Sequence, residues 1–315
     1  MRIKKIIFVG TSEFACPSLL ELASRKDYQI PLVVSQPDKP AGRNLKLCPS
    51  PVSALARDLN LPLECPEQIS APEFVDRISA LQPDLIITAS YGGMLGKALR
   101  HAAPLGAINL HPSLLPKYRG ASPIQEALRN GDSFTGISIF RLSARMDAGP
   151  ILAQKAFPIA ESENYAELHD RLASEAAIML MELLDNLQER EIIPEPQDEA
   201  IASYCHKIEK QDMLINWKQS AVSIVNLIRS LAPSPAAFQY LEDQPIKFIR
   251  ASVSTEKSAG EPGTIQELVK NTGFTINTGD YQLLVSLIQP AGKKIMSAWA
   301  FTLGQRSLPG TKIWK

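Results

Sequence analysis

Short, nearly continuous apolar runs are the feature that most constrains how this chain can fold. They lie at residues 3–9, 31–35, 83–90 and 106–110, and a loop follows each of them. Strands that are buried on both faces of a parallel sheet have this composition, whereas half-exposed strands alternate apolar and polar residues. Residues 17–24 have the pattern of a helix with proline in its first turn. The alternation of strands and helices predicts an α/β fold, with a Rossmann-like, doubly wound N-terminal domain and right-handed crossovers.

The first strand leads into a single glycine, Gly10, and not into a glycine-rich phosphate loop. Neither G-x-G-x-x-G nor P-loop spacing follows it. Those glycines are what allow a backbone to approach a pyrophosphate closely. We therefore expect no dinucleotide site, although the architecture is Rossmann-like.

A length of 315 residues exceeds what one hydrophobic core usually supports, so two domains are expected. Residues 164–190 have long helical periodicity, and the acidic, proline-containing segment that follows is typical of a linker. Residues 217–231 predict a helix, and the short β runs after residue 245 predict a small β-barrel. We predict domains at 1–190 and 207–315, joined by a linker at 191–206.

The charge of the chain is unevenly distributed, although 33 basic and 33 acidic residues balance overall. From His206 onward there are 13 Lys and Arg residues against 8 Asp and Glu residues. A basic C-terminal module suits a polyanion such as RNA, but a random distribution of surface charge explains the excess equally well.

The cysteines and apolar runs predict the compartment of the protein. The four cysteines form no CxxC pair or Cys/His cluster, which argues against a zinc site and a disulfide framework. No apolar run approaches the roughly 20 residues of a membrane span. The apolar run near the N-terminus is too short for a signal peptide and predicts a first strand. We expect a reduced, cytoplasmic protein without a metal or a membrane partner.

Two polar residues, Asn109 and His111, lie at the end of the strand that contains Ile108. Asn109 and His111 are two residues apart, so an extended backbone projects their side chains to the same side. An amide donor beside an imidazole can stabilise an oxyanion and move a proton. The competing interpretation is a strand end whose Asn and His satisfy the backbone of a turn.

Two other loops follow predicted strands, at the edge where open α/β sheets bind ligands. Residues 36–51 contain four prolines and the basic residues Lys39, Arg43 and Lys46, which suit phosphate contacts unless the loop is a solvated insertion. Tyr91 and Gly92 begin the second loop, where paired glycines allow a flat ligand to approach the backbone.

Together these segments resemble the methionyl-tRNA formyltransferase family nearly from end to end. The motifs that carry the resemblance are residues 10–15 (GTSEFA), 36–43 (QPDKPAGR), 49–52 (PSPV), 89–92 (ASYG), 109–125 (NLHPSLLPKYRGASPIQ), 147–149 (DAG) and 308–310 (LPG). The resemblance implies formyl transfer from 10-formyltetrahydrofolate to the amine of methionine on initiator methionyl-tRNA, by an enzyme that we expect to be a monomer. It also implies that the C-terminal β-barrel is an OB-like tRNA-binding domain.

The resemblance assigns roles to positions of this sequence. The implied catalytic residues are Asn109, His111 and Asp147. The implied folate-binding residues are Ser113, Leu114, Leu115 and Pro116, to which we add Tyr91 and Gly92. The implied tRNA contacts are Lys39, Arg43 and Lys46.

Several positions depart from the family pattern. Ser138 stands where threonine is usual and keeps the hydroxyl, whereas Asn216, Ala232 and Ser234 replace other usual residues. None of these positions belongs to the catalytic trio. Formyl transfer to an amino sugar nucleotide, hydrolysis of 10-formyltetrahydrofolate and RNA binding without catalysis are the alternatives, and the first two have less need of the basic loop.

Formyl transfer to an amine passes through a tetrahedral oxyanion, which Asn109 and His111 are suited to hold. Asp147 is expected to orient His111 and balance its charge, because an Asp near pKa 4 is a weak base unless it is desolvated. Which of His111 and Asp147 handles the amine proton stays open at this point.

Overall fold

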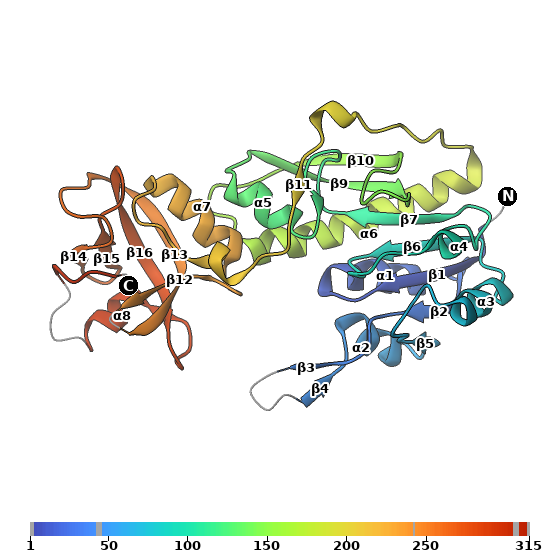
Figure 1. The fold of residues 1–315 in the computed structure, drawn as a ribbon, viewed down its shortest axis with the longest axis horizontal. Coiled ribbons are helices and arrows are strands. Elements are labelled where there is room, and N and C mark those ends of the chain that lie inside the picture. Colours follow the sequence, from blue (N-terminus) through green and yellow to red (C-terminus); the bar gives the residue numbers. More distant parts are fainter. Residues whose placement is uncertain (1–2, 42–45, 242, 305–308, 314–315) are drawn as a thin grey trace. The chain divides into compact units, whose positions relative to one another are not determined.

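The chain forms two compact units in the computed structural model, which describes residues 3–41, 46–241, 243–304 and 309–313 (Figure 1). The first unit comprises Met1–Pro123, Thr135–Phe157 and His169–Cys205, and the second comprises Ile124–Phe134, Pro158–Leu168 and His206–Lys315. Two segments from the first 190 residues thus belong to the second unit. The units are therefore not separated at a single point of the sequence.

A seven-stranded sheet forms the centre of the first unit, in the order β10-β9-β7-β6-β1-β2-β5. The strands are β1 (Lys5–Gly10), β2 (Gln29–Val34), β5 (Leu63–Glu64), β6 (Leu85–Ala89), β7 (Ala107–His111), β9 (Phe134–Arg141) and β10 (Ile151–Pro158). The first five are parallel, whereas β9 is antiparallel to β7. From β1 the chain builds outward through β2 to β5 and then crosses to β6 and β7, which is the doubly wound arrangement predicted from the sequence.

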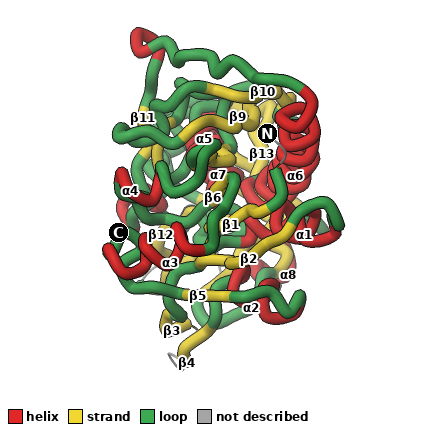
Figure 2. Tube along the Cα trace, turned by 90° about the vertical axis from the view of Figure 1, so that its right-hand side faces the viewer, coloured by secondary structure: helices red, strands yellow, loops and turns green. Residues whose placement is uncertain are grey.

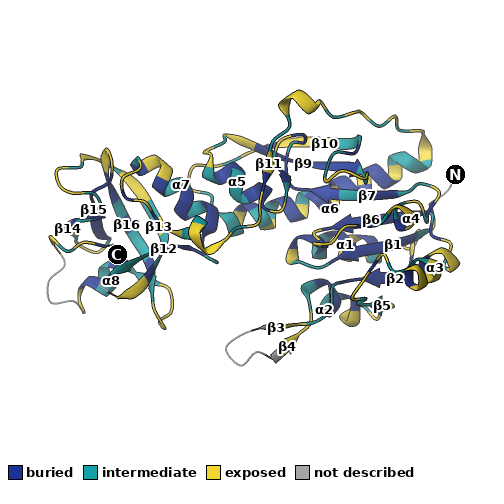
Figure 3. Cartoon of the chain, in the orientation of Figure 1, coloured by how far each residue is buried: buried dark blue, intermediate teal, exposed yellow. Residues whose placement is uncertain are grey.

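Helices cover both faces of this sheet (Figure 2). They are η1 (Glu13–Ala15), α1 (Cys16–Ser24), α2 (Pro51–Asp58), α3 (Pro72–Ala80), α4 (Lys97–Arg100) and the long α6 (Tyr165–Glu189). Ile7 and Val9 of β1 pack in one core cluster with Phe74 of α3 and Leu99 of α4. The alternate residue Phe8 is also fully buried, so both faces of β1 are packed, and Figure 3 shows most of this strand as buried.

The proline-rich segment after β2 is a hairpin and not an irregular loop. Its strands are β3 (Lys39–Ala41) and β4 (Lys46–Cys48), which pair antiparallel with Lys39 opposite Cys48. The hairpin follows the carboxyl end of β2, at the ligand-binding edge of the sheet. Lys39 is exposed there, whereas Arg43 and the side chain of Lys46 lie outside the described residues.

The segment that was expected to be a linker is bound to the first unit along most of its length. We call residues 194–205 the strap. Ile151 and Glu195 exchange two backbone hydrogen bonds of 2.7 and 2.8 Å. Near the other end of the strap, β11 (Tyr204–Cys205) pairs in parallel with β8 (Arg119–Gly120) after a short helix η2 (Glu199–Ile201). Composition identified the segment as a connection, but it could not show where the backbone hydrogen bonds of that connection go.

The second unit is built on an antiparallel sheet in the order β12-β13-β16-β15-β14, with β17 added to β16. Its strands are β12 (Ala237–Leu241), β13 (Gln244–Lys257), β14 (Ile265–Val269), β15 (Gly273–Ile276), β16 (Tyr281–Pro290) and β17 (Met296–Ser297). Its helices are α5 (Pro123–Arg129), η3 (Lys210–Met213), α7 (Ala221–Leu231) and α8 (Ala298–Thr302). The predicted fold class, a Rossmann-like domain with a small antiparallel β domain, is confirmed.

The core of the second unit is centred on two aromatic rings. Trp217 and Phe248 are at most 1% exposed, and their ring centroids lie 5.4 Å apart in an edge-to-face arrangement. The Trp217 indole N–H donates to the Ile313 carbonyl at 2.6 Å, which ties the C-terminal segment to this core. The helix that was predicted from residue 217 begins at Ala221, because the Ser220 side chain accepts the Ser223 N–H and caps the helix there.

No helix in the part of the chain that the structure describes is both long and apolar enough to cross a membrane.

Substituting Phe248→Ala should lower the free energy of unfolding of the second unit by about 3–5 kcal/mol, because a fully buried ring is replaced by a cavity. All three tryptophans of the chain lie beyond residue 206. Their fluorescence during urea unfolding of the full chain therefore reports on this unit. Val253→Ala is the matched control on the same strand, since Val253 is 39% exposed, and it should change the free energy by less than about 1 kcal/mol.

Candidate active site

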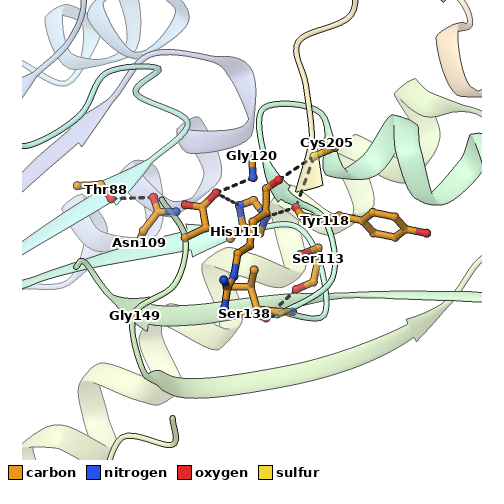
Figure 4. A network of polar contacts seen from close by, with 12 residues as sticks. Thr88, Asn109, His111, Ser113, Tyr118, Gly120, Ser138, Gly149 and Cys205 are labelled. Atoms are coloured by element: carbon orange, nitrogen blue, oxygen red, sulfur yellow. Dashed lines mark hydrogen bonds and ion pairs between the residues drawn. The ribbon is translucent and has the colours of Figure 1, made fainter. Parts of the chain in front are cut away.

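Strand β7 presents Asn109 at the carboxyl edge of the sheet. Thr88 lies opposite it on β6, and the Thr88 hydroxyl is 2.7 Å from Asn109 Oδ1 (Figure 4). The Thr88 hydroxyl donates to this amide oxygen and also lies 3.0 Å from the Ile108 carbonyl oxygen. The N–H₂ end of Asn109 is thereby directed away from Thr88 as a donor. Figure 4 shows Asn109 and His111 on the same side of β7, as the extended strand predicted.

His111 ends β7 and is only 4% exposed. Its Nε2 lies 2.9 Å from the Tyr118 carbonyl oxygen, and the edge of the imidazole packs against Phe140 with the centroids 6.4 Å apart. A carbonyl oxygen can only accept, so Nε2 carries a proton. The other ring nitrogen, Nδ1, lies 3.8 Å from Asp147 Oδ2.

Asp147 comes from the turn between β9 and β10 and completes the trio. Its Oδ2 accepts the Gly120 backbone N–H at 2.8 Å, on the same oxygen that faces His111. Its backbone has φ +49°, a left-handed conformation that side-chain-bearing residues adopt rarely. The structure thus brings together His111 and Asp147, which are far apart in the sequence. The turn requires glycine at position 149, because a Cβ there would overlap the Arg141 carbonyl oxygen.

The segment expected to contact folate, residues 113–116, is a tightly bonded loop after His111. Ser113 is fully buried, and its hydroxyl donates to the Lys117 carbonyl at 2.6 Å. Ser138 on β9 donates to the Ser113 carbonyl at 2.7 Å and accepts the Leu115 N–H at 3.0 Å. Gln154 donates to the Leu115 carbonyl and to Ser138 Oγ. Hydrogen bonds of Ser113, Ser138 and Gln154 therefore hold the shape of this loop.

Leu114, Leu115 and Pro116 differ in how much surface they present. Leu115 is 3% exposed and Pro116 is buried, whereas Leu114 is half-buried beside Gly136. A ligand at this loop would therefore meet its backbone and Leu114 more than the other two side chains.

Tyr91 and Gly92 lie in the loop after β6, as predicted. Tyr91 is buried, and the Thr11 hydroxyl donates to its carbonyl at 3.0 Å, which joins the loops after β1 and β6. Gly92 is exposed with φ +76°. Only glycine adopts this conformation without strain, so the turn exposes bare backbone at the sheet edge.

A polar network that was not predicted from the sequence lies beside the Asp147 turn. Arg119 is fully buried, and its guanidinium donates to Gln197, Glu199 and the Tyr204 hydroxyl. Arg119 holds the pKa of the Glu199 carboxyl below its usual value through this hydrogen bond, with help from Arg145. The partners of Arg119 are 78, 80 and 85 residues away along the chain. No local spacing rule could have connected them.

The described residues include no group of three or more His, Cys, Asp and Glu side chains placed to hold a metal ion.

Comparison with known families accounts for nearly the whole chain. Residues 4–184 match the formyl transferase family model, and residues 207–306 match the model of the formyl transferase C-terminal domain. A methionyl-tRNA formyltransferase from Trichlorobacter lovleyi is 41% identical over 309 residues, which cover 98% of this chain and 96% of the relative. One from Coxiella burnetii is 39% identical over 312 residues, which cover 98% and 99%. The chain belongs to the methionyl-tRNA formyltransferase family.

Solved structures with the same fold have diverged much further in sequence. A methionyl-tRNA formyltransferase from Clostridium thermocellum is 16% identical with a TM-score of 0.56, and the match covers 80% of this chain and 94% of that one. The sugar 3N-formyl transferase WlaRD is 18% identical with a TM-score of 0.65, and the match covers 93% and 100%. These structures confirm the fold and do not distinguish between acceptors.

Removing the Ser138 hydroxyl should loosen the loop after His111. We expect Ser138→Ala to lower the free energy of unfolding by about 1–3 kcal/mol, because it leaves the Leu115 N–H and the Ser113 carbonyl without this buried partner. Chemical denaturation followed by circular dichroism measures the loss. Hydrogen exchange should be faster at the Leu115 amide.

Ser133→Ala is the matched control, since Ser133 is exposed, and it should leave both measurements unchanged. Unchanged exchange at Leu115 in Ser138→Ala would contradict the structural role of Ser138.

Proposed function

We propose that this formyltransferase moves the formyl group of 10-formyltetrahydrofolate to the α-amino group of methionine on initiator methionyl-tRNA. The observation that carries the proposal is the trio of Asn109, His111 and Asp147 at one sheet edge, with Nδ1 of His111 3.8 Å from the Asp147 carboxylate. Support comes from relatives named methionyl-tRNA formyltransferase that are about 40% identical over nearly the whole chain. In this proposal, the folate and the tRNA contact different parts of the molecule.

The chemical step begins when the neutral amine attacks the formyl carbon. The C–N bond forms as the C=O electron pair moves to oxygen, and the tetrahedral oxyanion then collapses and breaks the bond to N10 of the folate. The Asn109 N–H₂ is suited to stabilise that oxyanion because Thr88 holds the other end of the amide. N10 leaves as an amine once it receives a proton, and the new amide loses one.

His111 and Asp147 together handle the proton in this scheme. Nε2 of His111 is occupied by the Tyr118 carbonyl, so proton exchange with the reacting nitrogen goes through Nδ1. We assign Asp147 the role of orienting His111 and balancing its charge, since one carboxylate oxygen faces Nδ1 and also accepts the Gly120 N–H. Placing amine and formyl carbon in contact supplies much of the remaining rate enhancement.

The folate co-substrate is proposed to lie between two loops of this edge. One contains residues 113–116, and the other contains Tyr91 and Gly92. The exposed backbone at Gly92 suits a flat ring that approaches closely. On the other side, the internal bonds of Ser113 and Ser138 pre-organise the loop against the ligand.

The tRNA is proposed to contact the β3–β4 hairpin and the second unit. Lys39, Arg43 and Lys46 would meet phosphates of the acceptor end, and exposed Lys39 is held by a hydrogen bond to Gln36 at 2.7 Å. The basic excess after residue 206 supports tRNA binding by residues 207–315. Residues 1–190 would then be the catalytic domain, with 191–206 as the connection, in a monomer that works in the cytoplasm.

Single substitutions in the trio should remove activity and leave the fold intact. We expect Asn109→Ala to lower kcat by about 10²–10³-fold, as for loss of an oxyanion donor. His111→Ala and Asp147→Ala should each abolish measurable formylation in an assay with charged initiator tRNA. His101→Ala is the control, because His101 is exposed and lies outside the site. Full activity of the His111 or Asp147 variant would refute the assignment.

Neutralising the hairpin should weaken use of tRNA without affecting the folate. We expect Arg43→Ala or Lys39→Ala to raise the KM for methionyl-tRNA several-fold. The slope of log KM for methionyl-tRNA against log salt concentration should fall by about one, as for the loss of one phosphate contact. The KM for 10-formyltetrahydrofolate should stay the same. Lys26→Ala is the matched control, since exposed Lys26 precedes β2 whereas the hairpin follows it. Equal effects of Lys26→Ala and Arg43→Ala would contradict the proposed contact.

A further inference from the structure

The strap contacts two segments next to the proposed catalytic residues, one on each side of the site. At one end, Glu195 pairs with Ile151 just after the Asp147 turn. At the other end, Arg119 N–H donates to the Ser203 carbonyl at 2.9 Å, and Ser203 N–H donates to the Pro116 carbonyl at 3.2 Å. The strap therefore contacts both the turn that carries Asp147 and the loop that follows His111.

Gln197 lies in the middle of the strap and uses every hydrogen-bonding position of its side-chain amide. Its Nε2 donates to the Asp147 carbonyl at 2.8 Å and to the Gly149 carbonyl at 2.7 Å. Its Oε1 accepts from Arg119 Nε at 3.1 Å and from Arg119 Nη2 at 2.8 Å. An amide has two donors and two acceptor positions, so none is left over.

Arg119 determines the orientation of that amide. A guanidinium has only donors, so the atom of Gln197 that faces it must be the oxygen, and the nitrogen must face the two carbonyls. Arg119 is itself fully buried and is bound by the Glu199 carboxylate at 2.9 Å. Glu199 also pairs with Arg145, which stands two residues before Asp147. The strap thus holds the Asp147 turn through two side chains.

The Asp147 turn needs such support. The backbone of Asp147 is at φ +49°, in the left-handed region, which costs most residues with a side chain about 1 kcal/mol and aspartate less, so contacts from neighbouring groups select this conformation. Gln197 binds the carbonyls on both sides of Ala148, and Gly120 binds the carboxylate. Without the amide, the turn is free to relax, and the carboxylate then leaves its place 3.8 Å from His111 Nδ1.

We propose that Gln197 is a positioning residue for formyl transfer, which acts through Asp147 and not by contact with either substrate. This inference rests on the proposed catalytic role of Asp147. It assigns a function in catalysis to a segment that composition marks as a connection between domains. Misplacement of a catalytic group by about 1 Å can cost about 10²-fold in rate.

The test compares two substitutions of Gln197 with a matched change on the same strap. Gln197→Met keeps the size of the side chain and removes all four hydrogen bonds. Gln197→Glu keeps an oxygen for Arg119 but turns a second oxygen toward the Asp147 and Gly149 carbonyls. Glu195→Gln is the control, because Glu195 is exposed and binds Ile151 through its backbone.

We expect kcat to fall about ten- to a hundredfold in both Gln197 variants, with the KM values for folate and tRNA changed less than about threefold. Glu195→Gln should retain the parent kcat. A merely structural role would instead lower the melting temperature or the amount of active enzyme. Active-site titration and thermal unfolding of the full chain separate these effects. A kcat within about threefold of the parent in Gln197→Met, or a loss confined to KM, overturns the inference.

A double-mutant cycle tests whether Gln197 acts through Asp147. Single-turnover rates are measured with excess enzyme for Asp147→Asn, Gln197→Met and the double variant. Because the amide has nothing to position once the carboxylate is gone, the double variant should react at the rate of Asp147→Asn alone. A further fall equal to that of the single Gln197→Met change overturns the inference. Full activity of Asp147→Asn would instead refute the proposed function of Asp147, so the two failures are distinguishable.

Discussion

Parallel pairing of β6 with β7 is the constraint on which the rest of the site depends. It places Thr88 beside Asn109 and brings the loops after both strands to one edge of the sheet. The register matters because a shift of one residue would turn Asn109 and His111 to the opposite face. Both strands are buried on both faces, so their apolar side chains fix that register against the helices. Packing of the core therefore fixes the geometry of this part of the site.

Asp147 depends on a different constraint, since no strand holds it. It sits in a turn with a left-handed backbone conformation, and the groups that hold this turn come from Gly120 and the strap. A trio assembled from one rigid strand and one supported turn can hold His111 and Asp147 close without a direct hydrogen bond between them. The turn is therefore where remote residues can influence the chemistry most.

Burial of Arg119 has a cost that its contacts must offset. A buried guanidinium loses its hydration, and buried ion pairs often contribute little net stability for that reason. Arg119 compensates with hydrogen bonds to Gln197, Glu199 and Tyr204 and by lying 5.8 Å from the Tyr204 ring centroid. Such a network yields a defined geometry more than it yields stability. Its position beneath the Asp147 turn is where a defined geometry is of use.

Local sequence patterns were enough to predict most strands and helices of the first unit, the presence of an α/β part and a β part, and the pair of Asn109 and His111 at the end of β7. These follow from periodicity and from neighbours within a few residues. The three-dimensional structure was needed to show that residues 124–134 and 158–168 join the second unit and that Arg119 contacts Gln197. Contacts between residues 78 positions apart arise from how the strap folds back over the sheet edge, and local composition carries no record of that path.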